Sequence, residues 1–230
     1  MSHDTLPKHI GIILDGNRRW AKQAGLKTLD GHKKGAEVFK ELSLDLFDKG
    51  VSYISAYVFS TENWNRAAEE VDYLMRLVVR AVELHLDEYP KKGIRIRILG
   101  LKDNLQPAVL KAIKRTEEKT ADNANGTLAL CFNYGGRQEL VNACREIAAS
   151  DISPDEITPE MITEHVYAPD IPDLDLLIRT SGEQRTSGFM MWRAWYAEMM
   201  FIDKFWPDMT TEDMDQALEE YAQRQRRFGC

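Results

Sequence analysis

The sequence predicts an α/β fold in which an open, mostly parallel β-sheet is flanked by helices. Short apolar runs rich in Ile, Val and Leu alternate along the chain with amphipathic segments of helix length. The apolar runs lack polar alternation, which is typical of strands buried on both faces. A length of 230 residues suits one domain with a sizeable core. Because no repeat or linker is visible, we expect a single domain over 1–230.

The predicted elements follow one another in a regular order. Each predicted strand is a run of β-branched and other apolar residues that ends at a polar or turn-forming residue. Strands are expected at 10–14, 51–59, 94–99, 127–132 and 174–178. Each predicted helix carries apolar residues at spacings of three and four. Helices are expected at 31–49, 69–89, 104–123, 138–149, 159–166 and 212–226.

Composition and charge exclude several classes of protein. The net charge of −7 argues against a general nucleic-acid binder. Three widely separated cysteines without a CxxC pair indicate neither a disulfide framework nor a zinc site, and they fit a reducing cytosol. The first residues lack the apolar core of a signal peptide, and no apolar run approaches 18 residues. We therefore expect a cytoplasmic protein.

The first strand leads directly into a cluster of charged residues. The stretch HIGIILDGNRRWAK, residues 9–22, places Asp15 at the end of an apolar run and two arginines just beyond it. Six basic residues lie between 15 and 34, and glycines there allow a ligand to approach the backbone. Gly31 and His32 are expected near a helix N-terminus, which is a natural anion site. This pattern suits a phosphate or diphosphate, although a solvated basic face is the alternative. Asp15 is a candidate Mg²⁺ ligand beside it.

Two later stretches also follow predicted strands. FSTENWNRAAEE, residues 59–70, is dense in polar side chains, and its alternative interpretation is helix capping around a buried Trp. DLLIRTSGEQRTSGF, residues 175–189, carries Arg179 and Arg185, whose forked guanidiniums suit phosphate oxygens. The alternative is surface ion pairing with Glu183 or Glu198. Because ligands of parallel sheets bind beyond the carboxyl ends of strands, all three stretches are expected to share one crevice.

An apolar stripe marks the predicted helix 69–89. It consists of Val71, Leu74, Met75, Val78, Val79 and Val82. This spacing is helical, and it fits either core packing or one wall of a tunnel for an apolar ligand. The familiar phosphate motifs GxxxxGK[ST] and GxGxxG are absent from the sequence, as is any Asp-Asp pair.

Taken together, these stretches resemble the cis-prenyltransferase family, typified by bacterial undecaprenyl diphosphate synthase. The resemblance runs in order along nearly the whole chain, through HIGIILDGNRRWAK, GHKKGAE, YVFSTENWNR, NYGGR, DLLIRTSGEQR, WYAE and the terminal RRFG. It implies an open parallel sheet with a hydrophobic tunnel, a homodimer and Mg²⁺ as cofactor. It also implies elongation of an allylic diphosphate by isopentenyl diphosphate units in cis, giving a long-chain lipid carrier for cell-wall sugars. Transient contact with the inner face of the membrane would then accompany product release.

The resemblance assigns roles to individual residues. Asp15 would bind Mg²⁺ with Glu198 as a second ligand, and Asn63 takes the position of the proton acceptor. Because an amide is a poor base, we expect Asn63 to position the substrate while a phosphate oxygen or Asp15 takes the proton. Substrate contacts are implied for Gly16, Asn17, Arg18, Arg19, Trp20, Thr28, His32, Ser60, Thr61, Glu62, Trp64, Arg66, Arg179, Arg185, Thr186, Ser187, Arg227 and Gly229. The last two belong to a C-terminal element that reaches toward the partner subunit's site.

Several positions depart from the family's usual pattern. Thr28 stands where an arginine is common, and Gly188 replaces the asparagine of the RxSN motif. Val58 and Phe132 stand where smaller residues are common, and Trp195 adds bulk near the end of the WxxxYAE stretch. Bulk along a tunnel would shorten the product, so a short-chain Z-prenyl diphosphate synthase is the alternative. A more distant alternative is a non-catalytic partner subunit, which typically lacks the loop aspartate that this chain has.

Overall fold

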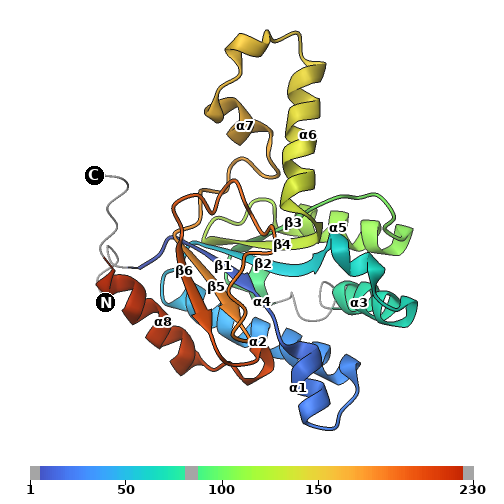
Figure 1. Ribbon diagram of the computed structural model, residues 1–230, viewed down its shortest axis with the longest axis vertical. Coiled ribbons are helices and arrows are strands. Elements are labelled where there is room, and N and C mark those ends of the chain that lie inside the picture. The colour runs from blue at the N-terminus through green and yellow to red at the C-terminus, as the bar shows by residue number, and fades with distance from the viewer. Residues whose placement is uncertain (1–5, 81–87, 225–230) are drawn as a thin grey trace.

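The computed structural model describes residues 6–80 and 88–224, apart from the side chains of 78–80. Its six strands form one sheet in the order β3-β4-β2-β1-β5-β6, and every neighbouring pair is parallel (Figure 1). The strands are β1 (His9–Ile13), β2 (Tyr53–Ser60), β3 (Ile94–Leu99), β4 (Gly126–Tyr134), β5 (Leu176–Thr180) and β6 (Glu198–Ile202). The predicted α/β class with an open parallel sheet is therefore confirmed.

Helices connect these strands. The described helices are α1 (Asn17–Gln23), α2 (Thr28–Asp48), α3 (Ala68–Arg80), α4 (Glu88–Lys91), α5 (Pro107–Thr120), α6 (Gly136–Ala149), α7 (Pro159–His165) and α8 (Thr211–Gln223). Short 3₁₀ turns occupy η2 (Thr61–Asn65), η4 (Pro154–Glu156) and η5 (Trp206–Asp208). Figure 1 shows α6 rising from the sheet with α7 beside it, at the opposite end of the molecule from α1.

Four local predictions were wrong or incomplete. No helix was predicted directly after Asp15, but Gly16, at φ 108°, completes a turn and α1 begins at the next residue. Strand β6 was not predicted because its edge position leaves most of its residues partly exposed. Helix α2 begins three residues before Gly31, so Gly31 and His32 lie within the helix and not at its start. The predicted helix 69–89 corresponds to α3 and α4, and 81–87 lie outside the described residues.

The sheet separates two apolar layers because side chains alternate along each strand. In β1, Ile10 and Ile12 join the larger core cluster, which includes buried residues of α2, α3, α5 and α8. Ile13 faces the other way, toward a second cluster that contains Phe189 and Met190. Both layers are closely packed, as expected for strands that are buried on both faces.

Strand β2 breaks this alternation near its carboxyl end. Its register with β4 shifts between Tyr57 and Phe59 and again between Phe59 and Ser60. Val58 is thus an extra residue in β2, as in a β-bulge. Because of it, Tyr57 packs in the second cluster while Phe59 packs in the larger one against Phe132, at 5.5 Å between ring centroids. The bulge therefore turns an aromatic ring toward the layer that contains the cavity described below.

Side chains cover part of the outer edge of β3. On β3, the outward N–H groups of Ile96 and Ile98 donate to Thr120 Oγ1 (3.0 Å) and Glu117 Oε1 (2.9 Å), side chains of α5. The Ile94 carbonyl accepts from Asn123 Nδ2 (2.9 Å). Side chains thus occupy three of the outward polar groups of β3.

Across 6–80 and 88–224, none of the helices combines the length and the apolar character needed to cross a bilayer.

Candidate active site

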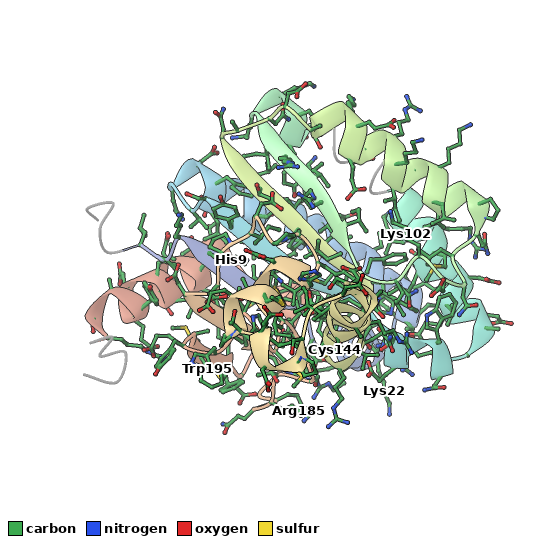
Figure 2. The ribbon with its side chains drawn as sticks, turned by 90° about the horizontal axis from the view of Figure 1, so that it is seen from above. His9, Lys22, Lys102, Cys144, Arg185 and Trp195 are labelled. Carbon is green, nitrogen blue, oxygen red and sulfur yellow. The ribbon has the colours of Figure 1, made fainter. Side chains whose placement is uncertain are left out.

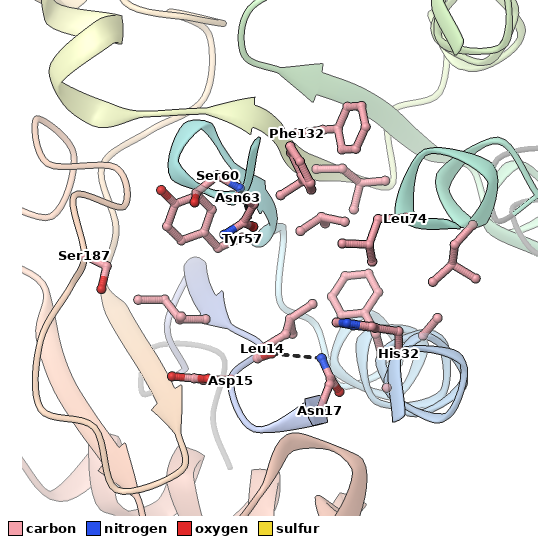
Figure 3. A pocket seen from close by; sticks show the side chains of 18 of the residues that line it. Leu14, Asp15, Asn17, His32, Tyr57, Ser60, Asn63, Leu74, Phe132 and Ser187 are labelled. Carbon is pink, nitrogen blue, oxygen red and sulfur yellow. Dashed lines mark hydrogen bonds between the residues drawn. The ribbon is translucent and has the colours of Figure 1, made fainter. Parts of the chain in front are cut away.

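The three polar stretches predicted to share a crevice do so. Asp15, Ser60 and Arg179 follow or end β1, β2 and β5, and all three line a cavity of about 620 Å³ between the sheet and helices α2 and α3. Figure 3 shows Asp15 and Ser187 at one end of this cavity, with Leu74 and Phe132 away from them. The cavity is thus polar at one end and apolar at the other.

A second pocket adjoins the polar end. It has a volume of about 820 Å³, and Arg18, Arg19, Lys22 and Thr28 belong to its lining. The two pockets share five lining residues, Leu14, Asp15, Asn17, His32 and Arg66. The second pocket, which we call the basic pocket, is thus continuous with the cavity that is apolar at its far end.

Asp15 is held by two arginines at the boundary of these pockets. Its Oδ2 accepts from Arg179 Nη2 (2.8 Å), and its Oδ1 accepts from the Gly16 N–H (2.8 Å) and lies 3.3 Å from Arg19 Nη2. Burial acts to raise the pKa of Asp15, but the neighbouring Arg179 and Arg19 outweigh it and lower the pKa below its ordinary value. The carboxylate is therefore ionised at neutral pH.

Arg179 is almost fully buried, with 4% of its surface exposed, and it connects two parts of the site. One terminal nitrogen donates to Asp15, and the other donates to the Arg185 carbonyl (2.6 Å) and to Ser187 Oγ (2.8 Å). Within 6–80 and 88–224, its buried Nε has no hydrogen-bond partner. The two terminal nitrogens of this guanidinium thus hold protein groups in place.

A second cluster lies on the other side of the cavity. Glu70, at the start of α3, accepts from Arg66 Nη1 (2.9 Å), lies 3.3 Å from His32 Nε2 and pairs more loosely with Arg18 (3.8 Å). Burial is the main reason that the pKa of His32 falls below its ordinary value, and Glu70 opposes this shift. The sequence interpretation did not include Glu70, although its position four residues after Arg66 on a helix start is a recognisable ion-pair spacing.

Asn63 lies on the wall of the cavity, and its side-chain oxygen already accepts a hydrogen bond from the protein. Its Oδ1 accepts from the Ser60 N–H (3.0 Å) in a capping arrangement. The neighbouring Trp64 is partly buried, where its Nε1 donates to Asn133 Oδ1 (2.7 Å) and its ring contacts Phe59. This loop therefore caps a short helix around a partly buried Trp, as the alternative interpretation expects. The same loop contributes Ser60, Glu62, Asn63 and Arg66 to the cavity lining.

Other predicted site residues are farther from the cavity. Trp20 donates to Asp208 Oδ1 (2.6 Å), and the side chain of Arg185 is exposed and pairs with Glu183. Neither pocket lining includes Trp20, Thr61, Trp64, Arg185, Thr186 or Glu198. Arg227 and Gly229 lie outside the described residues.

Within one protomer the structure places Glu198 away from Asp15, and its predicted role as a second Mg²⁺ ligand stays a prediction. Glu198 starts β6 and pairs in register with Leu176, which in turn pairs with Ile10. Asp15 lies five residues further along the strand direction, which corresponds to roughly 16 Å at the rise of a β-strand. Glu198 instead forms an ion pair with Arg224 (2.9 Å).

The donor set at Asp15 fits Mg²⁺ only in combination with a substrate. Within 6–80 and 88–224 there is no group of three His, Cys, Asp or Glu side chains placed to hold a metal ion. Asp15 offers one ionised, hard oxygen ligand beside a basic pocket. Mg²⁺ is typically bound by one or two carboxylates together with substrate phosphates and water. Asp15 therefore suits a magnesium ion that arrives with a phosphorylated ligand.

The predicted tunnel wall on α3 is partly confirmed. Leu74 lines the cavity, as does Leu77, which the predicted stripe did not include. Val71 and Met75 are buried in the larger core cluster instead. Part of the stripe thus packs in the core, and part of it lines the cavity. The side chains of Val78, Val79 and Val82 lie outside the described part of the structure.

These features suit a ligand in which a phosphorylated anion is attached to an apolar chain. Residues 13–229 match the model of a family described as putative undecaprenyl diphosphate synthase, and the chain belongs to this prenyltransferase family. Isoprenyl transferase 2 of Corynebacterium efficiens is 44% identical over 97% of this chain and 94% of that protein. Decaprenyl diphosphate synthase of Mycobacterium tuberculosis is 46% identical over 98% of this chain and 78% of its own length.

A solved structure shows the same fold. Lavandulyl diphosphate synthase from Lavandula x intermedia, in complex with dimethylallyl diphosphate, has a TM-score of 0.94 at 32% identity. The match covers 99% of this chain and 100% of that one. The chain is thus a transferase of prenyl groups with the fold of the cis-prenyltransferases.

Proposed function

We propose that this enzyme adds isopentenyl diphosphate units in cis to an allylic diphosphate, with Mg²⁺ as cofactor, and so makes a long-chain, undecaprenyl-type lipid carrier. The proposal rests on the continuity of the basic pocket with the apolar cavity, since Asp15 lines both of them. An amphipathic substrate fits this arrangement, because its diphosphate would lie among the arginines and its prenyl chain in the cavity.

The residues divide between two diphosphates. Arg18, Arg19, His32 and Arg66, with Thr28 at the pocket wall, surround the space proposed for the allylic diphosphate. The turn that carries Arg185 and Ser187 would bind isopentenyl diphosphate, and Arg179 fixes that turn relative to Asp15. When bound to Asp15 and substrate phosphates, Mg²⁺ supplies charge neutralisation for the departing diphosphate. The surrounding guanidiniums stabilise the same charge, since they are already oriented before the C–O bond breaks.

The structure favours a substrate phosphate oxygen as proton acceptor. Asn63 is an amide whose oxygen already accepts from a backbone N–H, so we assign it a positioning role. Asp15 is a weak base because its pKa lies below the ordinary value. This leaves the phosphate oxygens of the substrates as the basic groups nearest the reaction.

One observation favours the second candidate, a short-chain Z-prenyl diphosphate synthase. Phe59 and Phe132 both line this cavity, and bulky rings there leave less room for a long prenyl chain.

Product analysis tests the reaction and separates the two candidates. The purified protein is incubated with Mg²⁺, isopentenyl diphosphate and, in separate reactions, allylic diphosphates of 10, 15 and 20 carbons. Products near 55 carbons support the carrier-lipid proposal, and products of 20 carbons or fewer support the short-chain candidate. Absence of any product from all three primers would contradict both and favour the non-catalytic subunit.

We further propose a homodimer. Four large side chains around β6 are exposed: Met191 (41%), Trp195 (78%), Tyr196 (52%) and Met199 (40%). Exposed apolar patches of this kind mark interaction surfaces. Figure 2 shows Trp195 and Arg185 along the same margin of the molecule. Light scattering on the eluting protein measures the mass, and a monomer at micromolar concentration would contradict the proposal. Product release at the inner face of the membrane and a cytoplasmic location remain predictions.

A further inference from the structure

The guanidiniums of the site are paired with three carboxylates, and two of these, Glu70 and Glu183, have no role in the proposed chemistry. Five arginines, Arg18, Arg19, Arg66, Arg179 and Arg185, pair with three acidic side chains, Asp15, Glu70 and Glu183. Each acidic side chain contacts two arginines. The excess of positive charge leaves the site attractive to a diphosphate, and the pairing limits repulsion among the arginines before a ligand arrives.

Glu183 differs from the other two acidic residues in what it connects. Its Oε1 accepts from Arg19 Nη1 (2.7 Å), and its Oε2 accepts from Arg185 Nη1 (2.5 Å). Arg19 belongs to α1 and to the pocket proposed for the allylic diphosphate. Arg185 belongs to the turn proposed for isopentenyl diphosphate. One carboxylate thus joins the two subsites across a sequence separation of 164 residues.

The surroundings of Glu183 hold this bridge in one geometry. Its backbone segment is fixed because the Ser181 N–H donates to the Lys204 carbonyl (2.8 Å) and the Gly182 N–H donates to the Ile202 carbonyl (3.0 Å). On the other side, Arg19 lies over the Phe205 ring, 5.7 Å from its centroid, and beside Asp15. The two arginines also keep the pKa of Glu183 below its ordinary value, so the bridge is charged at neutral pH.

We propose that Glu183 is a positioning residue that sets the spacing between the two diphosphate subsites. It acts through Arg19 and Arg185 and need not touch either substrate. Because both substrates must be aligned for the new bond to form, a carboxylate that fixes one guanidinium of each subsite sets their relative placement. This inference rests on the proposed function.

The main variant is Glu183→Gln, which keeps the size of the side chain and removes its charge. The matched control is Asp170→Asn, because Asp170 also bridges two arginines, Arg95 (3.2 Å) and Arg97 (3.0 Å), away from the site. We expect E183Q to raise the KM of both substrates about fivefold, the scale of a partly exposed ion pair. D170N should leave both constants unchanged, and Glu183→Asp should restore part of the loss.

A double variant tests whether Glu183 acts through its arginine. In the Arg19→Gln background, E183Q should cause no further rise in the KM of the allylic substrate, because coupled residues are not additive. A full additional fivefold rise there would overturn the mechanism. A change in only one KM would show that Glu183 does not join the subsites. A fall in both would show that it competes with the diphosphates.

Binding of inorganic diphosphate, measured by calorimetry, separates this inference from the proposed function. If wild-type protein forms no prenyl product but E183Q still binds diphosphate more weakly than D170N does, the proposed reaction fails and the bridge stands. If products form normally and E183Q equals D170N in KM and in diphosphate binding, the bridge has no positioning role.

Discussion

Arg179 makes the most demanding prediction, because one buried guanidinium holds both Asp15 and the 185–187 turn. In Arg179→Lys the positive charge stays but the planar fork is lost, and a single ammonium cannot reach all three acceptors. If it keeps Asp15, the bonds to the Arg185 carbonyl and Ser187 Oγ are lost. At about 1.5 kcal/mol for each bond from a charged donor, the loss is about 3 kcal/mol. If this loss of free energy falls on the transition state, kcat/KM decreases about 100-fold.

The assay is a titration of isopentenyl diphosphate at saturating allylic substrate, with circular dichroism melting on the same samples. Arg97→Lys serves as the control, because Arg97 is a partly exposed arginine that pairs with Asp170 outside the site. The melting curve shows whether the loss is one of folding. A kcat/KM for R179K within fivefold of the wild type, in a folded protein, would refute the reasoning.

The charge of Arg179 has a separate signature in the pH profile. Arg179→Gln removes the main partner that lowers the pKa of Asp15, so this pKa should rise. In the wild type, Asp15 contributes stability above its unfolded pKa, about 3.9, and loses it as the pH falls through the lower folded value. The acid limb of kcat/KM should therefore move to higher pH in R179Q. An unmoved limb would show that Arg179 does not control this carboxyl.

Four simpler changes test other parts of the site. Asp15→Ala should reduce turnover at least a thousandfold, the scale of a lost electrostatic catalyst, and unchanged turnover would remove it from the mechanism. Phe132→Ala removes a six-carbon ring from the cavity wall and should lengthen the largest product by about one five-carbon unit, as mass spectrometry of the dephosphorylated products can show. Trp195→Glu should shift the mass measured by light scattering from dimer toward monomer. An unchanged dimer mass would place this exposed ring outside the interface. Chelation of Mg²⁺ should stop turnover while the melting temperature stays within a degree, because the structure holds Asp15 with two arginines and not with a metal cluster.

The sequence was sufficient for five of the six strands and for the grouping of Asp15, Ser60 and Arg179, because buried strands and the ends of parallel strands leave local patterns. It was not sufficient for α1, since a turn at Gly16 and a helix that starts immediately after it look like one loop. The position of Glu198 relative to Asp15 was not visible in the sequence, because its motif carries no information on which end of an edge strand it occupies. Glu183 was considered only as a surface ion-pair partner, and Glu70 was not considered as a site residue. The contacts of Glu70 with His32 and Arg18, and of Glu183 with Arg19, span elements far apart in sequence, so only the tertiary arrangement shows them. The single domain over 1–230 remains a prediction.

The side-chain bonds on the edge of β3 limit how copies of this chain can associate. Side chains of Glu117, Thr120 and Asn123 already occupy three of the polar groups that another strand would use there. An added strand would have to displace them, so an assembly that uses a sheet edge is expected on the β6 side, beside the exposed Trp195. A contact in which two copies present the same edge to each other closes on itself. Growth by strand addition would stop at two chains, so the fold itself opposes open-ended fibres at the concentrations of a crowded cell.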